Sequence, residues 1–201
     1  MTEAASGRHV MRCTLAVAGV ASLVTLAATA QVPARTRQPV NAQAAGLQDF
    51  QTRLEGYLKL RASLVQKMKP LAPTPSATEL AARQTAIAAA LKQARAAARP
   101  GDLVPATVAA QIATTIREDF KRRSAADERA TFSEVPAAAR PAINQTYPAD
   151  AALPTVPPLL LLNLPRLPDN LQYRFYGRHL LLLDGDAHII VDYIANVLPP
   201  H

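Results

Sequence analysis

Hydrophobic and polar positions in the last part of the chain follow the pattern of β-strands. Three short runs rich in Leu, Ile, Val, Tyr and Phe are separated by two groups of turn-forming residues, Gly177-Arg178 and Asp184-Gly185-Asp186, and runs bounded in this way are typical of strands. The gap between the first two runs holds two residues with Gly first, which favours a type II′ hairpin turn. We therefore predict a three-stranded antiparallel meander, with strands at about 171–176, 179–184 and 187–194.

The two turns decide which side chains share a face of this sheet, because successive residues of a strand point to opposite sides. With Gly177-Arg178 and Gly185-Asp186 as the loops, His179 lies opposite Tyr176 in the first strand and Asp192 in the third. One face is then apolar and carries Leu171, Tyr173, Phe175, Leu180, Leu182, Ile189, Val191 and Tyr193. The other is mixed and carries Gln172, Arg174, Tyr176, His179, Leu181, Leu183, His188, Ile190 and Asp192. Three strands alone are marginally stable, so we expect helices to cover the apolar face.

Apolar residues recur at helical spacing through the middle of the chain. Steps of three and four residues predict helices at about 44–69, 76–98 and 104–123, and a fourth, shorter helix continues to about Phe132. The second helix has a clear start, because Ser76 and Glu79 match the capping box. The predicted fold class is therefore α+β, with a bundle of three or four helices followed by the meander.

Proline dominates residues 135–170, which link the helices to the strands. Proline fixes φ and removes a hydrogen-bond donor, so this segment is predicted to be extended or turned and not helical. It contains the run Leu159–Leu162, and four consecutive leucines are costly to expose. We expect the segment to form a strap that is buried against the helices; the alternative is a free proline-rich ligand for a partner domain.

The first thirty residues resemble a secretory signal peptide. A polar start with Arg8 and Arg12 leads into the uncharged run 14–30, which ends in Ala28-Thr29-Ala30. We expect cleavage after Ala30, a flexible linker at 31–43, a single domain at 44–201, and location in the periplasm or outside the cell. Met11 is an alternative start, and a buried helix or an uncleaved anchor is an alternative role for the run. The run is shorter than the ~20 residues that span a bilayer, so no stable transmembrane anchor is expected after cleavage.

Charge and cysteine content restrict the classes of partner and of chemistry that the chain can have. The chain carries a formal net charge of +7, but its basic residues are spread over the helices and Lys121-Arg122-Arg123 is the only run of three, so no nucleic-acid partner is expected. An anionic lipid or polymer suits this charge better. The single cysteine, Cys13, lies within the predicted signal peptide. The mature chain therefore has neither a disulfide nor a thiol for catalysis.

The block PPLLLLNLPRLPDNLQYRFYGRHLLLLDGDAHIIVDYI, residues 157–194, resembles the C-terminal signature LPxLPxxLxYRFxGRxLxLxD…IVDxI of uncharacterised exported bacterial proteins. The positions that match are Pro165, Pro168, Tyr173, Arg174, Gly177, Arg178, Asp184 and Asp192. The resemblance implies export and a small α+β domain, and it brings no activity. The hairpin alone is distantly similar to the C-terminal module of RcnB-type periplasmic metal-homeostasis proteins.

Candidate chemistry gathers on the mixed face of the predicted sheet. His179 opposite Asp192, with Arg174, Tyr176, Arg178 and His188 nearby, forms the one possible binding site. A carboxylate can orient an imidazole as a base or as a metal ligand, but two histidines make a poor zinc site and no GxSxG, HExxH or CxxC motif is present. A cross-strand ion pair is the preferred interpretation. We therefore assign no catalytic residue, no metal ligand and no cofactor.

Two classes of function remain open on this evidence. The preferred one is a non-catalytic envelope protein that binds an unknown protein, peptide or polymer through the strap and the hairpin. The other is a hydrolase or a periplasmic metal-handling protein that uses His179 and Asp192. A polar pocket converging on His179 would favour the second class. An apolar groove or an open hairpin edge would favour the first.

Overall fold

The longest element of the computed structural model is the helix α1, Pro39–Gln66, which begins five residues before the predicted start at Ala44 and takes in the end of the predicted linker. Proline is favourable in the first turn of a helix, where its missing N–H costs nothing. The structure describes residues 39–134, 140–147 and 156–199. The predicted signal peptide and residues 31–38 of the predicted linker lie outside this range.

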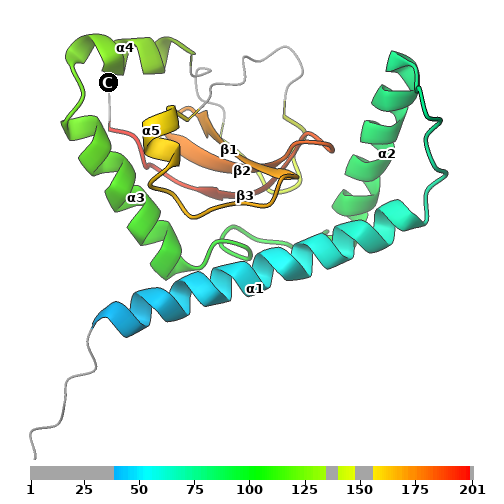
Figure 1. Ribbon diagram of the computed structural model, residues 1–201, viewed down its shortest axis with the longest axis horizontal. Coiled ribbons are helices and arrows are strands. Elements are labelled where there is room, and N and C mark those ends of the chain that lie inside the picture. Colours follow the sequence, from blue (N-terminus) through cyan, green and yellow to red (C-terminus); the bar gives the residue numbers. More distant parts are fainter. Residues whose placement is uncertain (1–38, 135–139, 148–155, 200–201) are drawn as a thin grey trace, which may run out of the picture. The chain divides into compact units, whose positions relative to one another are not determined.

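Three more helices follow at the predicted places. The helix α2, Ala77–Ala94, begins with the predicted capping box: Ser76 N donates to Glu79 Oε2 at 2.7 Å and Glu79 N donates to Ser76 Oγ at 3.2 Å. The helix α3, Ala106–Lys121, buries Val108, Ile112, Ile116 and Phe120, which recur every four residues. The short α4 runs over Ala125–Glu134. The helix α1 contacts both α2 and α3, which lie to the right and to the left of the sheet in Figure 1.

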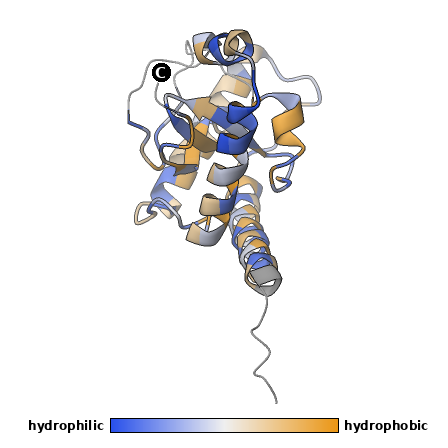
Figure 2. Cartoon of the chain, turned by 90° about the vertical axis from the view of Figure 1, so that its left-hand side faces the viewer, coloured by the Kyte–Doolittle hydropathy of each residue, from blue (hydrophilic) through white to orange (hydrophobic). Residues whose placement is uncertain are grey.

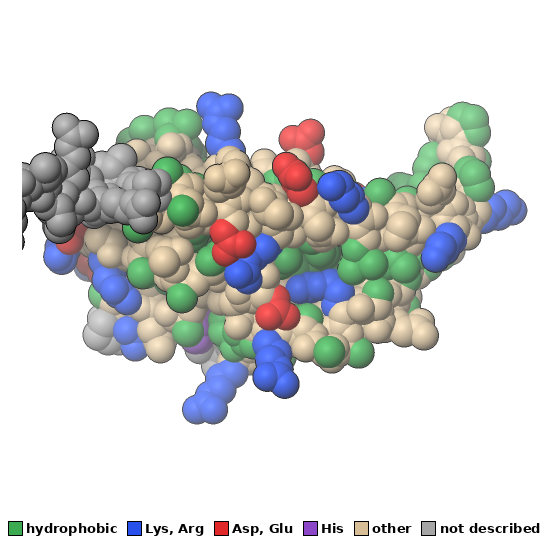
Figure 3. Space-filling model, turned by 90° about the horizontal axis from the view of Figure 1, so that it is seen from below, with side chains coloured by type: hydrophobic (Ala, Val, Ile, Leu, Met, Phe, Trp, Pro, Cys, Tyr) green, Lys and Arg blue, Asp and Glu red, His purple; other side chains and the backbone are tan. Residues whose placement is uncertain are grey.

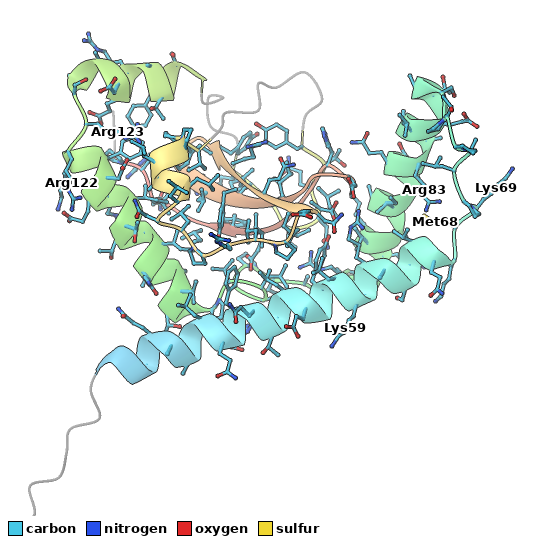
Figure 4. The ribbon with its side chains drawn as sticks, in the orientation of Figure 1. Lys59, Met68, Lys69, Arg83, Arg122 and Arg123 are labelled. Atoms are coloured by element: carbon cyan, nitrogen blue, oxygen red, sulfur yellow. The ribbon has the colours of Figure 1, made fainter. Side chains whose placement is uncertain are left out.

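Arginine side chains fasten the ends of these helices (Figure 4). Arg83 of α2 donates from Nη1 to Lys69 O at 2.5 Å and so holds the loop after α1. Arg123, just after α3, pairs with Asp119 at 2.6 Å and lies over the Phe120 ring. The basic run Lys121-Arg122-Arg123 therefore stabilises the C-terminal end of α3, where cations are favourable. Lys59 projects away from α1 in the same view.

The predicted meander is confirmed. The strands β1, Leu171–Tyr176, β2, His179–Asp184, and β3, Ile189–Ile194, form one antiparallel sheet in the order β1-β2-β3. The register of the first hairpin is also confirmed, from Tyr176 opposite His179 to Tyr173 opposite Leu182. Gly177 has φ +55° and Arg178 does not have a positive φ, as a type II′ turn requires.

The predicted register of the second hairpin is wrong. The turn holds four residues, 185–188, so that Asp184 lies opposite Ile189, and a bulge after Leu183 then places Asp192 opposite Leu182. His188 makes the longer turn possible by adopting a left-handed backbone conformation, φ +48°, which histidine tolerates better than most residues. The bulge moves Tyr193 to the second face of the sheet and Ile194 to the first.

Both faces of the sheet are buried. The first face packs into the main core with α1, α2 and α3, and its predicted apolar set is confirmed except for Tyr193. The second face was expected to be mixed and partly exposed, but it forms a second core of Tyr147, Tyr176, Leu181, Leu183 and Ile190. Tyr147 belongs to residues 140–147, which pair with the outer edge of β3, and its side chain packs on this face.

The strap departs from its predicted conformation at one point. Residues Pro158–Leu161 form a single helical turn, α5, because Pro157 and Pro158 preset the first turn. Only Leu160 of the four leucines is buried; Leu159 and Leu162 are 75% and 79% exposed and Leu161 is 45% exposed. The expectation of a fully buried run is therefore wrong. Figure 2 shows α5 as an orange, hydrophobic turn at the rim of the view.

Charged side chains project from the helical surface (Figure 3). Basic and acidic side chains are interspersed along the face that Figure 3 shows. Among the helices in the described part of the chain, none combines the length and the apolar character needed to cross a membrane.

Candidate ligand-binding site at the edge of strand β1

Asp192 does not meet His179, because the second hairpin has a different register from the predicted one. Asp192 is completely buried and accepts hydrogen bonds from the backbone N–H groups of Gly101, Leu103 and Val104, at 2.8–2.9 Å. Its own neighbour Tyr193 N adds a fourth, at 2.8 Å. A carboxylate ringed by backbone donors holds the α2–α3 loop against β3. Asp192 is therefore a structural residue.

His179 lies near the end of the chain instead. Its Nδ1 accepts a hydrogen bond from Asn196 N at 3.4 Å, and its ring makes an edge contact with Tyr193. Burial and the neighbouring Arg178 guanidinium lower the pKa of His179 below its ordinary value of 6.5. The predicted ion pair with Asp192 would have raised this pKa, and that pair is not formed.

A second buried carboxylate, Asp184, anchors the turn between β2 and β3 to α1. Its Oδ2 accepts from Tyr57 OH at 2.5 Å and from Arg61 Nε at 2.8 Å, and its Oδ1 accepts from Ala187 N at 2.8 Å. Burial and Asp184 raise the pKa of Tyr57. Burial alone would lower the pKa of Arg61, but Asp184 and Asp186 outweigh it and raise the pKa. Asp184 therefore has every polar partner that it needs and is not available for a ligand.

The buried Arg95 binds the backbone of β3 and a residue of the segment beside its outer edge. It donates to Val191 O at 2.9 Å and to Asn144 Oδ1 at 3.3 Å, and its guanidinium lies over the Tyr57 ring. Burial lowers the pKa of Arg95. The sequence analysis did not identify Tyr57, Arg61 and Arg95 as site residues, because nothing in a helical pattern reveals partners that are distant in sequence. One local signal was available: Tyr57 and Arg61 are four residues apart and therefore share a face of the helix, which allows both to bind one group.

The remaining predicted site residues are dispersed. Tyr176 is buried against Tyr147, with ring centroids 5.8 Å apart. Arg178 Nε donates to Leu198 O at 3.1 Å and holds the chain end. His188 lies in the four-residue turn. Arg174 lines a pocket that combines apolar walls with a cationic group, and Arg178 lines another one, together with Phe120 and Leu198.

This strap pocket lies between residues 156–168 and β1, and its volume is about 450 Å³, within the range of ligand sites in proteins. Its apolar lining is Val156, Leu161, Leu162, Leu164, Leu167, Leu171 and Tyr173. The exposed side chains of Leu161 and Leu162 continue it onto the surface. Tyr173 OH donates to Pro165 O at 3.2 Å and keeps the strap at this distance from the strand.

The pocket lies along the outer edge of β1, where Tyr173 and Phe175 are buried. β1 pairs only with β2, and in a hairpin closed by the pair Tyr176–His179 the backbone groups of Tyr173 and Phe175 point away from β2. Within the described residues these groups have no backbone partner, and the first outward group, Leu171 N, is bonded to Pro168 O at 2.9 Å. Side chains from both faces of β1 line the pocket, Tyr173 from the first and Arg174 from the second. The pocket therefore straddles the strand edge.

Arg174 is half-buried at this edge. Its Nη2 donates to Gln172 Oε1 at 2.7 Å and its Nη1 lies 3.4 Å from Tyr173 O, so the guanidinium bends over the edge of its own strand. Its Nε is buried without a hydrogen-bond partner, and no ion pair with a described carboxylate is formed. Burial lowers the pKa of Arg174. Arg174 is thus a cation that lacks the anionic partner that such groups normally have.

The described residues include no group of three or more His, Cys, Asp or Glu side chains placed to hold a metal ion. Comparisons with protein-family models, curated proteins and solved structures find no match. The chemistry of the chain must therefore be argued from its own geometry.

Proposed function

We propose that the protein is an exported, non-catalytic binding protein of the cell envelope that holds an extended segment of a partner protein in the strap pocket. The observation that supports this most is the apolar strap pocket, whose rim carries the exposed side chains of Leu161 and Leu162. Such a pocket can take up the apolar side chains of an extended peptide. Burial of Leu161 and Leu162 would supply the apolar gain.

The geometry favours this over the catalytic and metal-handling alternative. That alternative needs His179 and Asp192 side by side, and Asp192 is enclosed by backbone donors beneath the α2–α3 loop. The strap pocket is lined mostly by apolar side chains and does not include His179.

A peptide as long as β1, six residues, tests the proposed function. The probe alternates leucine and threonine, is blocked at both ends and is titrated by calorimetry. We expect binding through the leucine side chains. A peptide in which every leucine is replaced by threonine should not bind.

Leu162→Asp is the matching change in the protein, because it places a charge at the apolar rim. It should weaken the peptide at least tenfold, about 1.4 kcal/mol. Leu71→Asp is the control, since Leu71 is exposed but lies outside the strap pocket. Failure of every peptide to bind, or equal binding by both variants, would sink the proposal.

Export is tested separately. The basic start and Ala28-Thr29-Ala30 support cleavage after Ala30. Mass spectrometry of the protein recovered from a bacterial envelope should find Gln31 at the N-terminus. An intact N-terminus in a soluble cytoplasmic fraction would contradict this part of the proposal.

A further inference from the structure

A second cavity lies where the chain folds back, after β3, beside α3, α4 and the turn that follows β1. Asn196 has a left-handed backbone conformation, φ +53°, and reverses the chain there. Val197 N and Leu198 N then donate to Arg178 O, at 2.8 and 3.2 Å. The cavity has a volume of about 660 Å³, and no described residue lines both it and the strap pocket. We call it the basic cavity, and it is lined by Arg117, Phe120, Lys121, Arg123, Glu128, Arg178, Asn196, Leu198 and Pro199.

Positive charge dominates the lining of the basic cavity. Four of the described lining side chains are cations and one, Glu128, is a carboxylate. Lys121 and Arg123 are already paired with carboxylates of α3, at 2.7 and 2.6 Å. Arg117 and Arg178 form no ion pair with a described carboxylate. The uncompensated positive charge of the cavity therefore resides on these two arginines.

Arg117 and Arg178 each use one nitrogen to hold the end of the chain. Arg117 Nη2 donates to Asn196 O at 3.2 Å, and Arg178 Nε donates to Leu198 O at 3.1 Å. The other nitrogens of the two guanidinium groups make no hydrogen bond within the described residues, and neither side chain is closed to solvent. The basic cavity therefore presents two guanidinium groups with unused donors, held in place by carbonyl groups two residues apart.

The unused donors fit a phosphate group. A guanidinium matches the oxygens of a phosphate with two parallel hydrogen bonds, and a phosphate has more acceptor oxygens to share between two arginines than a carboxylate has. Arg117 and Arg178 come from two separate elements, α3 and the turn after β1. We infer that the basic cavity binds a phosphate group, carried by a small soluble compound or by a phospholipid headgroup, and that Arg117 and Arg178 are its main contacts.

Recognition in this cavity rests on charge and not on apolar contact. Phe120 and Leu198, which line it, are only 5% and 1% exposed, so a ligand gains little there by burying apolar surface. The strap pocket has the opposite character, with exposed leucines at its rim. The inference is therefore independent of the peptide site proposed above.

Inorganic phosphate and acetate test the inference on the full-length chain, by calorimetry at low salt. We expect phosphate to bind about tenfold more tightly than acetate, the effect of one further charged hydrogen bond. Phosphate should also raise the pKa of His179 relative to the phosphate-free protein, as measured by NMR. Burial and, after it, the Arg178 guanidinium lower that pKa, and an anion at Arg178 would offset the guanidinium charge.

Variants assign the binding to the cavity. Arg178→Gln should weaken phosphate about tenfold, and Arg117→Gln, which removes a more exposed group, about two- to fivefold. Glu128→Gln should strengthen phosphate by about two- to fivefold, because it removes a carboxylate from the cavity. Arg83→Gln is the control, since Arg83 also holds a backbone carbonyl, Lys69 O, but lies outside the cavity.

Vesicles distinguish the two sources of phosphate. Vesicles of phosphatidylcholine, with and without phosphatidylglycerol, are sedimented with the wild-type chain and with Arg117→Gln. Weaker binding of the variant to the phosphatidylglycerol vesicles would assign the cavity to lipid headgroups. Equal vesicle binding, together with weaker binding of inorganic phosphate by the variant, would assign it to soluble compounds. The predicted signal peptide is present in both chains and does not affect the comparison.

Other outcomes would overturn the inference. Equal affinities for phosphate and acetate, or an equal loss in Arg83→Gln and Arg117→Gln, would show a diffuse charge effect. A wild-type chain that binds no phosphate and no phosphatidylglycerol, with a less stable Arg178→Gln variant, would show that the two arginines only fasten the chain end. Arg117→Gln changes an exposed side chain and decides the matter if Arg178→Gln does not fold. None of these results bears on the strap pocket.

Discussion

The two edges of the small sheet differ in the hydrogen bonds that their backbone groups make. The edge at β3 is closed: Asn144 N, Ile190 N and Tyr147 N make backbone bonds of 2.8–2.9 Å across it, and Arg95 and Asp192 fasten its far end. The edge at β1 has no backbone partner at Tyr173 and Phe175 among the described residues, but both residues are buried, and the strap pocket with its exposed leucines lies beside it. The β1 side, with its apolar pocket and exposed leucines, is therefore the better candidate for binding, and the edge at β3 is structural.

The largest expected effect of a single change falls on the closed edge. Asp192→Ala leaves the N–H groups of Leu103 and Val104 buried without an acceptor, so we expect a loss of about 3–5 kcal/mol in the free energy of unfolding. Asp102→Ala is the control: its exposed side chain accepts only from Arg99 N, and its loss should cost about 1 kcal/mol. Denaturant unfolding measures both. Comparable losses would show that Asp192 does not lock this edge.

The next prediction compares the two faces of the sheet. Leu181 is 0% exposed and Leu182 is 1% exposed, on opposite faces of β2. Truncation of either to Ala should cost about 2–5 kcal/mol. If the second face were mixed and partly exposed, as the sequence predicted, Leu181→Ala would reduce the free energy of unfolding much less than Leu182→Ala. A much smaller loss at Leu181 in urea melts would mean that the second core is not tightly packed.

A smaller effect is expected at the turn that joins β2 to β3. Tyr57→Phe removes one of the two side-chain donors to Asp184 Oδ2 and leaves Arg61 in place. A hydrogen bond to a charged group contributes about 1.5–3 kcal/mol, and the remaining Arg61 should keep the loss near the lower end. Thermal or denaturant unfolding measures it. An unchanged stability would show that Arg61 alone satisfies the carboxylate.

The sequence was sufficient where a signal was local. Ser76 and Glu79 identified the start of α2, and Gly177-Arg178 defined the first hairpin and hence the side of the sheet on which Arg174 lies. The second turn was ambiguous, because Asp184-Gly185-Asp186 suits loops of different lengths. The longer loop is stabilised by Tyr57 and Arg61, residues more than a hundred positions away, and by the left-handed conformation of His188. No local pattern could reveal this.

The site residues, too, divide into those that a local sequence pattern identified and those that it did not. Arg174 was singled out because it lies near His179 on the predicted mixed face, and the structure places it on the strap pocket. The strap pocket itself could not be predicted, since it depends on which leucine of the run 159–162 turns inward. One helical turn buries Leu160 and exposes its neighbours, although an exposed apolar run is unfavourable on general grounds. That conflict between sequence expectation and structure falls at the rim of the strap pocket and is consistent with a surface that is covered in a complex.

The smallest expected effect is a pH dependence at the hairpin end, between the two edges. Burial and Arg178 lower the folded-state pKa of His179 below 6.5, so the unfolded chain takes up the proton first as the pH falls. Stability should therefore be undiminished above about pH 6.5 and decrease slightly as the pH falls below it. His179→Asn should remove this decrease in melts compared at about pH 7.5 and about pH 5.5. An NMR titration that gives His179 a raised pKa would instead restore a carboxylate partner, and with it the pairing across β2 and β3 that the second hairpin excludes.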